Sequence, residues 1–128
     1  MYDFIDRVLE CESGQRIVAI KALALNEEFF QDHFPGAPVL PGAMILEGFV
    51  QAARRCLDDP AGGGSPWILH AAANLRFNRF VSPGDVLRLE AKREESEGGA
   101  TWFSGHATCD GETVCRVRFA VRRRAEGH

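Results

Sequence analysis

A single helix-forming segment dominates this sequence, and its apolar residues cover nearly its whole circumference. We expect this helix to run from about Pro41 to Leu57. Pro41 suits its first turn, where the missing N–H is not needed for a hydrogen bond. Apolar residues recur along it at spacings of three and four: Met44, Ile45, Leu46, Phe49, Val50, Ala52, Ala53 and Cys56. A helix that is apolar on nearly all sides is enclosed by the rest of the protein. The remaining chain must therefore wrap around it.

The other patterned segments have the alternation and the β-branched residues of strands. Two precede the helix, at 4–12 and 15–25, and four follow it, at 67–81, 85–96, 100–110 and 112–124. Turn signals separate the strands near Ser13-Gly14 and at 82–85, 98–99 and 110–111. Short turns join antiparallel strands, so we expect an α+β domain in which an antiparallel sheet of about six strands wraps around the helix. Dimerisation through the sheet would cover its open edge.

The composition argues against several classes of function. With 128 residues the chain fits one domain, residues 1–128, and can bury a core without disulfides or metals. It is 45% hydrophobic and 26% charged with a formal net charge of −3, so nothing favours a nucleic-acid partner. No apolar run reaches the roughly 20 residues of a membrane span, and the acidic N-terminal segment lacks the basic region of a signal peptide. We therefore expect a cytoplasmic protein with no membrane association.

The four cysteines have neither CxxC spacing nor the Cys/His spacing of a metal site. A two-residue turn at 110–111 would place Cys109 opposite Glu112 and Cys115 opposite His106, so these two sulfur atoms would not meet. One cysteine beside one histidine does not make a metal site. We expect four reduced, mostly buried thiols and no metal.

Two ionisable residues stand out around the predicted helix. His33 precedes a loop rich in proline and glycine, and Glu47 interrupts the apolar run. An imidazole titrates near neutral pH and suits a general base. Apolar neighbours favour the neutral, protonated form of a carboxyl group, which a proton donor needs. Gly42, in the first helical turn, can present an unpaired backbone N–H at the positive end of the helix dipole.

These residues lie in motifs that resemble the β-hydroxyacyl-acyl-carrier-protein dehydratases. "NEEFFQDHFPGAPVLPGAMILEGFVQAA", at 26–53, resembles the core motif of that family, with His33 and Glu47 at the spacing of its catalytic pair. "LRFNRFVSPGDVL", at 75–87, resembles its second signature, a strand followed by a Pro-Gly-Asp turn. Residues 2–23 resemble its opening strands. The resemblance covers nearly the whole chain, so it is more specific than an isolated short motif.

The resemblance implies the hotdog fold and a dehydration without metal or cofactor. A (3R)-hydroxyacyl thioester on an acyl carrier protein would become the trans-2-enoyl thioester. His33 would remove the α-proton, Glu47 would protonate the departing hydroxyl group, and the Gly42 amide would polarise the thioester carbonyl. Gln51 would orient the carboxyl group by a hydrogen bond.

In that family the histidine of one subunit works with the acid of the other. The resemblance therefore implies a homodimer, or a trimer of such dimers. Further substrate-binding positions on the matched motif are Phe34, Pro41 and Met44.

A basic run, "RVRFAVRRR" at 116–124, has two interpretations. As a final strand with outward arginines it would protect a sheet edge. It could also attract an acidic carrier protein, together with Arg76, Arg79 and Arg54. Such electrostatic steering mainly raises the association rate and weakens with salt.

Several positions depart from the family pattern. Asp32 stands where a small residue is usual, and Phe80 stands where the family often has proline. The tyrosine that gates the family's tunnel has no counterpart, because the only tyrosine is Tyr2. These departures leave the acyl-chain length and the pathway open, either fatty-acid synthesis or a specialised polyketide or polyene route.

Three alternatives remain at the level of sequence. A hotdog thioesterase would use Glu47 as a base or nucleophile and would not need His33. A non-catalytic subunit that binds acyl carrier protein would need neither group. Taken singly, Glu47 could be a buried acid paired with an arginine such as Arg76. A related dehydratase that also isomerises its product carries aspartate at the Glu47 position, so glutamate favours dehydration alone.

Overall fold

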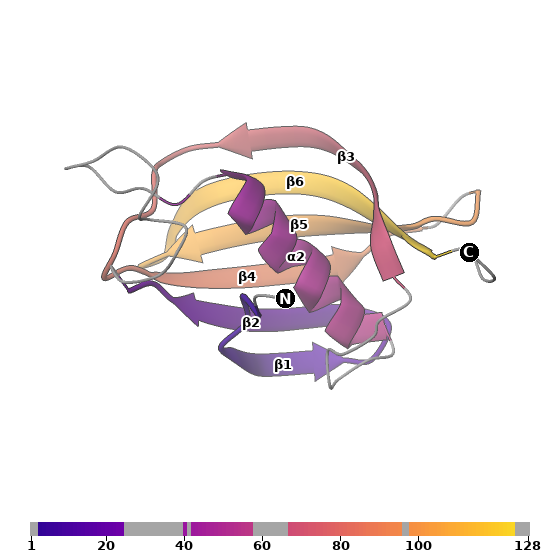
Figure 1. Ribbon diagram of the computed structural model, residues 1–128, viewed down its shortest axis with the longest axis horizontal. Helices are drawn as coiled ribbons and strands as arrows, with labels where there is room; N and C mark the ends of the chain where they lie inside the picture. The colour runs from indigo at the N-terminus through magenta and orange to yellow at the C-terminus, as the bar shows by residue number, and fades with distance from the viewer. Residues whose placement is uncertain (1–2, 25–39, 41, 58–66, 96–97, 125–128) are drawn as a thin grey trace.

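The computed structural model describes residues 3–24, 40, 42–57, 67–95 and 98–124. Two strands precede the helix and four follow it (Figure 1). In chain order the elements are β1 Arg7–Glu12, β2 Arg16–Ala22, α2 Gly42–Leu57, β3 Trp67–Phe77, β4 Val86–Arg93, β5 Thr101–Cys109 and β6 Glu112–Arg123. The helix ends at the predicted residue, and each strand lies within its predicted segment.

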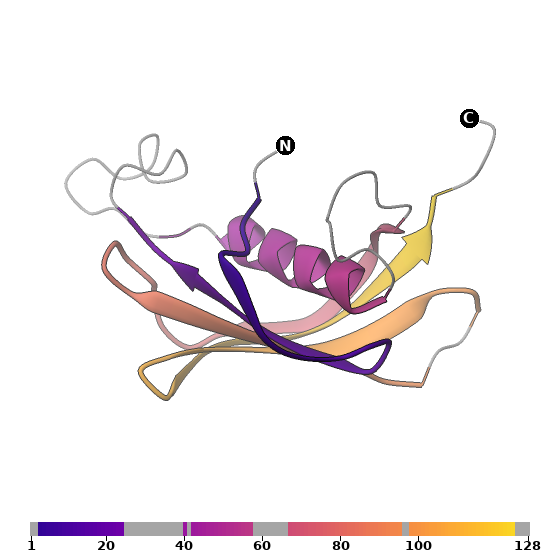
Figure 2. The ribbon, with the colours of Figure 1, turned by 90° about the horizontal axis from the view of Figure 1, so that it is seen from below.

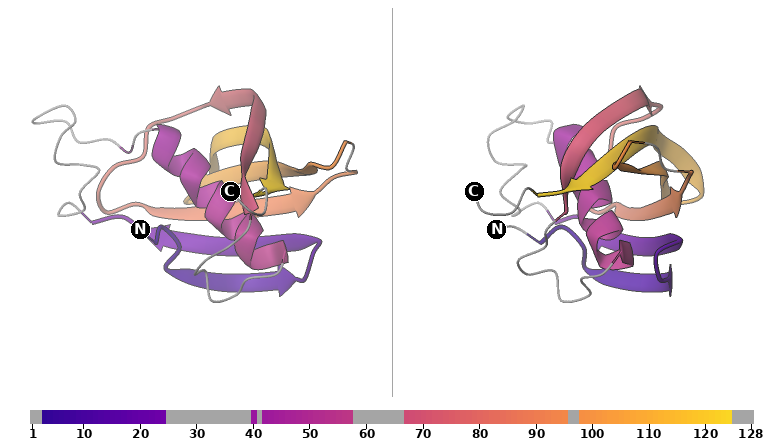
Figure 3. Two further views of the ribbon diagram at one scale, coloured as in Figure 1. Left: turned by 45° about the vertical axis from the view of Figure 1, so that its right-hand side comes forward. Right: turned by 90° about the vertical axis from the view of Figure 1, so that its right-hand side faces the viewer.

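The strands form one six-stranded sheet in the order β1-β2-β4-β5-β6-β3, and every neighbouring pair is antiparallel. The sheet curves, and α2 lies on its concave side (Figure 2). Seen from the end of the molecule, the strands wrap partly around the helix (Figure 3). This arrangement confirms the predicted α+β class. The strand that follows the helix, β3, pairs with the last strand and forms an edge of the sheet.

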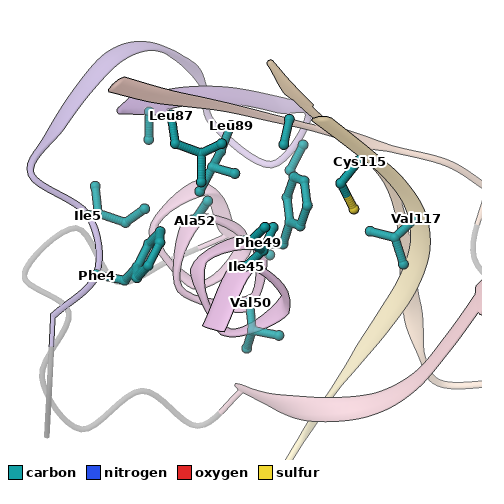
Figure 4. Packing of buried hydrophobic residues seen from close by; sticks show 14 of the residues in the cluster. Phe4, Ile5, Ile45, Phe49, Val50, Ala52, Leu87, Leu89, Cys115 and Val117 are labelled. Carbon is teal, nitrogen blue, oxygen red and sulfur yellow. The ribbon is translucent and has the colours of Figure 1, made fainter. Parts of the chain in front are cut away.

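Strict alternation along β5 builds the central part of the interface between sheet and helix. In β5 the odd-numbered residues from Thr101 to Cys109 are buried, and the residues between them are half-buried on the outer face. The core residues of α2 meet these inward side chains: Phe49 and Ala52 face Leu87, Leu89 and Cys115 of the sheet (Figure 4).

Two glycines allow aromatic rings to lie against the backbone. A Cβ at Gly48 would lie 2.6 Å from Cδ1 of Phe4, so the helix can approach that ring only because the side chain is absent. A Cβ at Gly105 would lie 2.9 Å from Cε1 of Phe49. Both contacts are closer than real Cβ atoms allow, so the close helix–sheet packing depends on these glycines.

The β5–β6 hairpin begins as predicted and then departs from the predicted register. Asp110 and Gly111 have φ values of 51° and 79°, as a two-residue type I′ turn requires, and Cys109 opposes Glu112. A register shift follows, so that Cys115 opposes Ala107. The predicted pairing of Cys115 with His106 is therefore wrong.

The structure confirms free and mostly buried thiols. All four cysteines are free, and only Cys11 is exposed. Burial raises the pKa of Cys115 to about 11. No helix in the described ranges has the length and apolar character to cross a membrane.

The side of α2 that faces away from the sheet stays partly open in the single chain. Met44 and Leu46 are only half-buried there, and the side chain of Glu47 is 39% exposed. The edge strand β3 also exposes large apolar side chains, namely Leu69, Leu75 and Phe77. One chain therefore leaves a helix face and a sheet edge available to another surface.

Candidate active site

Glu47 is held by two donors from its own helix. Nε2 of Gln51 donates to Oε1 of Glu47 at 3.3 Å, and Nη1 of Arg54 lies 3.7 Å from the same oxygen. These residues follow Glu47 by four and seven positions, which places all three on one face of the helix. Both groups approach Oε1, and no hydrogen bond or ion pair from the described residues reaches Oε2.

Gln51 connects this carboxyl group to the N-terminal segment. Its side chain is 8% exposed, and its Oε1 accepts a hydrogen bond from the backbone N–H of Phe4 at 2.7 Å. The amide therefore has a fixed orientation: its oxygen faces Phe4 and its nitrogen faces Glu47. The hydrogen bond expected from the sequence is present.

Gly42 begins α2 beside a pocket of about 350 Å³. The Phe77 ring lies so close to Gly42 that a Cβ there would be 2.7 Å from Cζ of Phe77. Around the pocket, the helix start meets the segment that follows β3: Leu40, Gly42, Ile45, Phe77, Asn78, Arg79, Phe80 and Val81. The two motifs that lie far apart in the sequence thus share one pocket.

Polar contacts fix the backbone of the segment that follows β3. Leu40 N donates to Val81 O at 2.7 Å, and Nε of Arg79 donates to Phe80 O at 3.2 Å. Arg79 also pairs with Asp85 at 3.4 Å. Phe80, which is 79% exposed, therefore stands on a well-supported backbone at the pocket.

The three arginines predicted to form a patch for a carrier protein lie in different parts of the fold. Arg54 lies on α2, where its Nε donates to Trp67 O at 2.8 Å. Arg79 lies at the pocket, and Arg76 lies on β3 opposite Arg116. Arg54, and not Arg76, is the arginine nearest to Glu47 in the described residues.

Some predicted site residues cannot be placed. His33, Phe34 and Pro41, together with Asp32, lie outside the described residues. Met44 lies half-buried on the first turn of α2. The roles predicted for all of these residues, and for Glu47, Gly42 and Gln51, stay predictions.

Known proteins resemble this chain along most of its length. Residues 1–118 match the FabA-like domain family. The 3-hydroxyacyl-[acyl-carrier-protein] dehydratase FabZ of Shewanella loihica is 41% identical over 124 residues, which cover 94% of this chain and 81% of that protein. The dehydratase FabZ of Klebsiella pneumoniae is 40% identical over 125 residues, 95% of this chain and 83% of that protein. The chain belongs to the FabA-like dehydratase family.

The fold of this FabA-like chain is also that of solved hotdog proteins. The dehydratase heterocomplex ApeI:P from Xenorhabdus doucetiae superposes with a TM-score of 0.74, covering 96% of this chain and 100% of that chain. The sequence identity is 20%, so this likeness concerns the fold alone. The family and fold predicted from the motifs are confirmed.

Sequence reasoning missed two contacts of the FabA-like site. Arg54 reaches Glu47, and its spacing of seven from Glu47 along a helix could have indicated this. The Phe77 ring covers Gly42, and no local pattern predicts it, because the two residues belong to segments that meet only in the folded sheet.

Replacing Gln51 tests how the site is held. Gln51→Ala removes both the acceptor for Phe4 N–H and the donor to Glu47, so we expect the free energy of unfolding to fall by about 1–3 kcal/mol. Gln51→Glu keeps an acceptor for Phe4 but places a second carboxyl group beside Glu47. Urea unfolding should therefore show a smaller loss for Gln51→Glu, whereas turnover should fall in both variants. Equal stability of Gln51→Ala and wild type would contradict a structural role for the Phe4 hydrogen bond.

Proposed function

We propose that this FabA-like protein dehydrates (3R)-3-hydroxyacyl thioesters carried on an acyl carrier protein, giving the trans-2-enoyl thioester and water. The observation that carries the proposal is the match of 94% of the chain to a named 3-hydroxyacyl-[acyl-carrier-protein] dehydratase. The geometry of Glu47 is consistent with it, because the described residues fix the carboxyl group through Oε1 and leave Oε2 without a hydrogen bond or ion pair.

In the proposed reaction His33 takes the proton from the α-carbon, and the electrons of that C–H bond form the new double bond. The bond between the β-carbon and oxygen breaks, and Glu47 gives its proton to the departing hydroxyl group. Oε1 of Glu47 accepts from Nε2 of Gln51, and Oε2 is proposed as the oxygen that gives the proton. The exchange leaves water, a protonated His33 imidazole and an ionised Glu47 carboxylate, and needs no metal or other cofactor.

The backbone N–H of Gly42 is proposed to stabilise the negative charge that develops on the thioester oxygen. Gly42 is the first residue of α2, so its N–H has no acceptor within the helix and lies at the positive end of the dipole. One such donor is typically worth about 3 kcal/mol of barrier. Phe34, Pro41 and Met44 are proposed to contact the substrate.

The proposed assembly is a cytoplasmic homodimer, or a trimer of such dimers. Glu47 faces the open side of α2, and β3 exposes its edge and its apolar side chains. A second subunit that covers this side would bring its own His33 toward Glu47 and remove water from the carboxyl group. The site would then be complete only in the dimer.

An assay with purified protein separates this function from its rivals. Enoyl thioesters of different lengths are supplied, and hydration and free thiol are both measured. Hydration without thiol release is expected. Thiol release would indicate a thioesterase, and absence of both would indicate a non-catalytic subunit. The preferred acyl length then bears on the pathway, fatty-acid or specialised polyketide synthesis.

A further inference from the structure

Two cysteines from distant parts of the chain meet where the helix ends. Cys11 lies near the end of β1, and Cys56 lies in the last turn of α2. Sγ of Cys56 donates to the backbone carbonyl of Glu12, the residue after Cys11, at 3.7 Å. A hydrogen bond also joins the side chains of Cys11 and Cys56. The two thiols are therefore in contact in the folded chain, although β2 and most of α2 lie between them in the sequence.

The pairing of β1 with β2 turns Cys11 toward the helix. Cys11 opposes Ile17 on β2, and opposed residues of an antiparallel pair project from the same face of the sheet. Ile17 is fully buried in the core cluster with residues of α2. Cys11 therefore faces the side of the sheet that carries the helix, and α2 ends over the end of β1 (Figure 1). Because β1 is an edge strand, Cys11 is nevertheless exposed.

The end of α2 is held in this position by backbone contacts. In the turn between β1 and β2, the N–H of Gly14 donates to the carbonyl of Cys56 at 2.7 Å. The thiol and the carbonyl of Cys56 are thus both bonded to the β1–β2 hairpin. A disulfide needs an S–S distance of about 2.0 Å, so the two sulfur atoms must still approach each other. An edge strand has only one neighbour in the sheet and can make that small adjustment.

The two thiols differ in their access to solvent. Cys11 is exposed, whereas Cys56 is buried. The pKa of the Cys56 thiol is raised, first by its burial and then by the neighbouring Cys11. The thiolate is the reactive form, so an oxidant in solution meets Cys11 first and leaves Cys56 protonated. An exposed cysteine beside a second thiol that can resolve it is the arrangement of redox-sensitive pairs.

We propose that Cys11 and Cys56 form a reversible disulfide that fastens the end of α2 to β1 when low-molecular-weight disulfides such as oxidised glutathione accumulate. The Cys11 thiol loses its proton and attacks one sulfur of the small disulfide. A mixed disulfide forms on Cys11, and one glutathione leaves with that proton. Cys56 then loses its proton and attacks the sulfur of Cys11, which releases the second glutathione. The two protein thiols are oxidised, and one glutathione disulfide is reduced to two thiols.

This disulfide would add a covalent link to a part of the fold that already has two polar links. Arg55 pairs with Asp3 at 2.8 Å, and Gln51 accepts from the N–H of Phe4 at 2.7 Å. Both contacts join the last turns of α2 to the segment that leads into β1. A disulfide that closes a long loop restricts the unfolded chain and so stabilises the fold. In a reducing cytoplasm both residues stay thiols, the state that the structure has.

The test maps the disulfide after treatment with oxidised glutathione. Remaining thiols are alkylated in denaturant without reduction, and the protein is digested with trypsin. Cys11 falls in peptide 8–16 and Cys56 in peptide 56–76, whereas Cys109 and Cys115 share peptide 94–116. For the wild type we expect peptides 8–16 and 56–76 joined to each other and separated by dithiothreitol. The free thiols should fall from four to two, and a non-reducing denaturing gel should show a single-chain band.

Three variants separate the two steps. Cys11→Ser should give no joined peptides. Cys56→Ala should keep glutathione on Cys11, because the second step lacks its thiol. Cys109→Ala is the matched control, since it removes a buried cysteine outside the pair and should form the same joined peptides as wild type. If Cys56→Ala does not fold, Cys56→Ser decides by the same comparison.

Urea unfolding tests whether the disulfide fastens the fold. At a fixed protein concentration, the midpoint of the oxidised wild type should exceed that of the reduced protein by about 1–2 M, from the usual stabilisation by a disulfide and the usual urea slope. The oxidant should leave the midpoint of Cys11→Ser unchanged. An unchanged midpoint in wild type that contains the joined peptides would overturn the proposed fastening.

The peptide map can also contradict the pairing itself. Glutathione that stays on Cys11 in the wild type would show that Cys56 cannot reach it. A covalent dimer on the non-reducing gel would show that Cys11 pairs with a second chain. A disulfide within peptide 94–116, with peptides 8–16 and 56–76 unjoined, would assign the redox chemistry to Cys109 and Cys115. Each of these results would overturn the proposal.

Discussion

Glu47→Gln is expected to lower kcat by about 10²–10⁴-fold, the usual contribution of a positioned general acid. Glutamine has nearly the shape of glutamate and can still accept the contacts of Gln51 and Arg54 through its oxygen. It lacks the proton that the departing hydroxyl group needs. The loss should therefore appear in kcat with intact folding, measured as hydration of an enoyl thioester and by circular dichroism.

The control is Glu10→Gln on β1, where the carboxyl group makes an exposed ion pair with Arg16. Its turnover should equal that of wild type. Near-normal activity of Glu47→Gln would remove Glu47 from the mechanism. His33→Ala is expected to lose turnover to a similar extent, because removal of the α-proton would lack its base.

Mixing the two inactive variants tests whether the site is shared between subunits. In a heterodimer of His33→Ala with Glu47→Gln, one of the two sites would combine an intact His33 with an intact Glu47. Random exchange of subunits should therefore restore about a quarter of wild-type activity, as a twofold dimer with shared sites requires. No recovery after verified exchange would place both groups in one subunit or refute their pairing.

Phe49→Ala is expected to lower the free energy of unfolding by about 3–5 kcal/mol, the range for removing a buried phenylalanine. Phe49 has no exposed surface, and its ring centroid lies 5.8 Å from that of Phe119. The Phe49 ring also lies against Gly105 of β5. Gly105 has no side chain that could fill the cavity left by the missing ring. The helix and the sheet would both lose their central contact.

Urea unfolding at a fixed protein concentration measures this loss, and the concentration matters because assembly adds to apparent stability. Phe80→Ala is the matched control, since the same side chain is 79% exposed there and the change should stay within about 0.5 kcal/mol. A loss in Phe49→Ala no larger than in Phe80→Ala would contradict the assigned core.

The sequence predicts the elements well and their pairing less well. The end of α2 at Leu57 follows from its apolar spacing, because helix formation depends on neighbours three and four residues away. The register of the β5–β6 hairpin does not follow from the turn alone. Val114 and Cys115 are consecutive and both buried, and the bulge lets both face the core. That choice depends on packing against the helix.

The sequence by itself determined the family, through the two long motifs, and the placement of Glu47 and Gln51 on one helix face, through a spacing of four residues. The tertiary structure alone decided which distant groups meet. Pairing of β3 with β6 lays Phe77 over Gly42 and brings Arg76 beside Arg116. Contacts between segments far apart in the chain depend on how whole surfaces pack, which no local pattern of residues specifies.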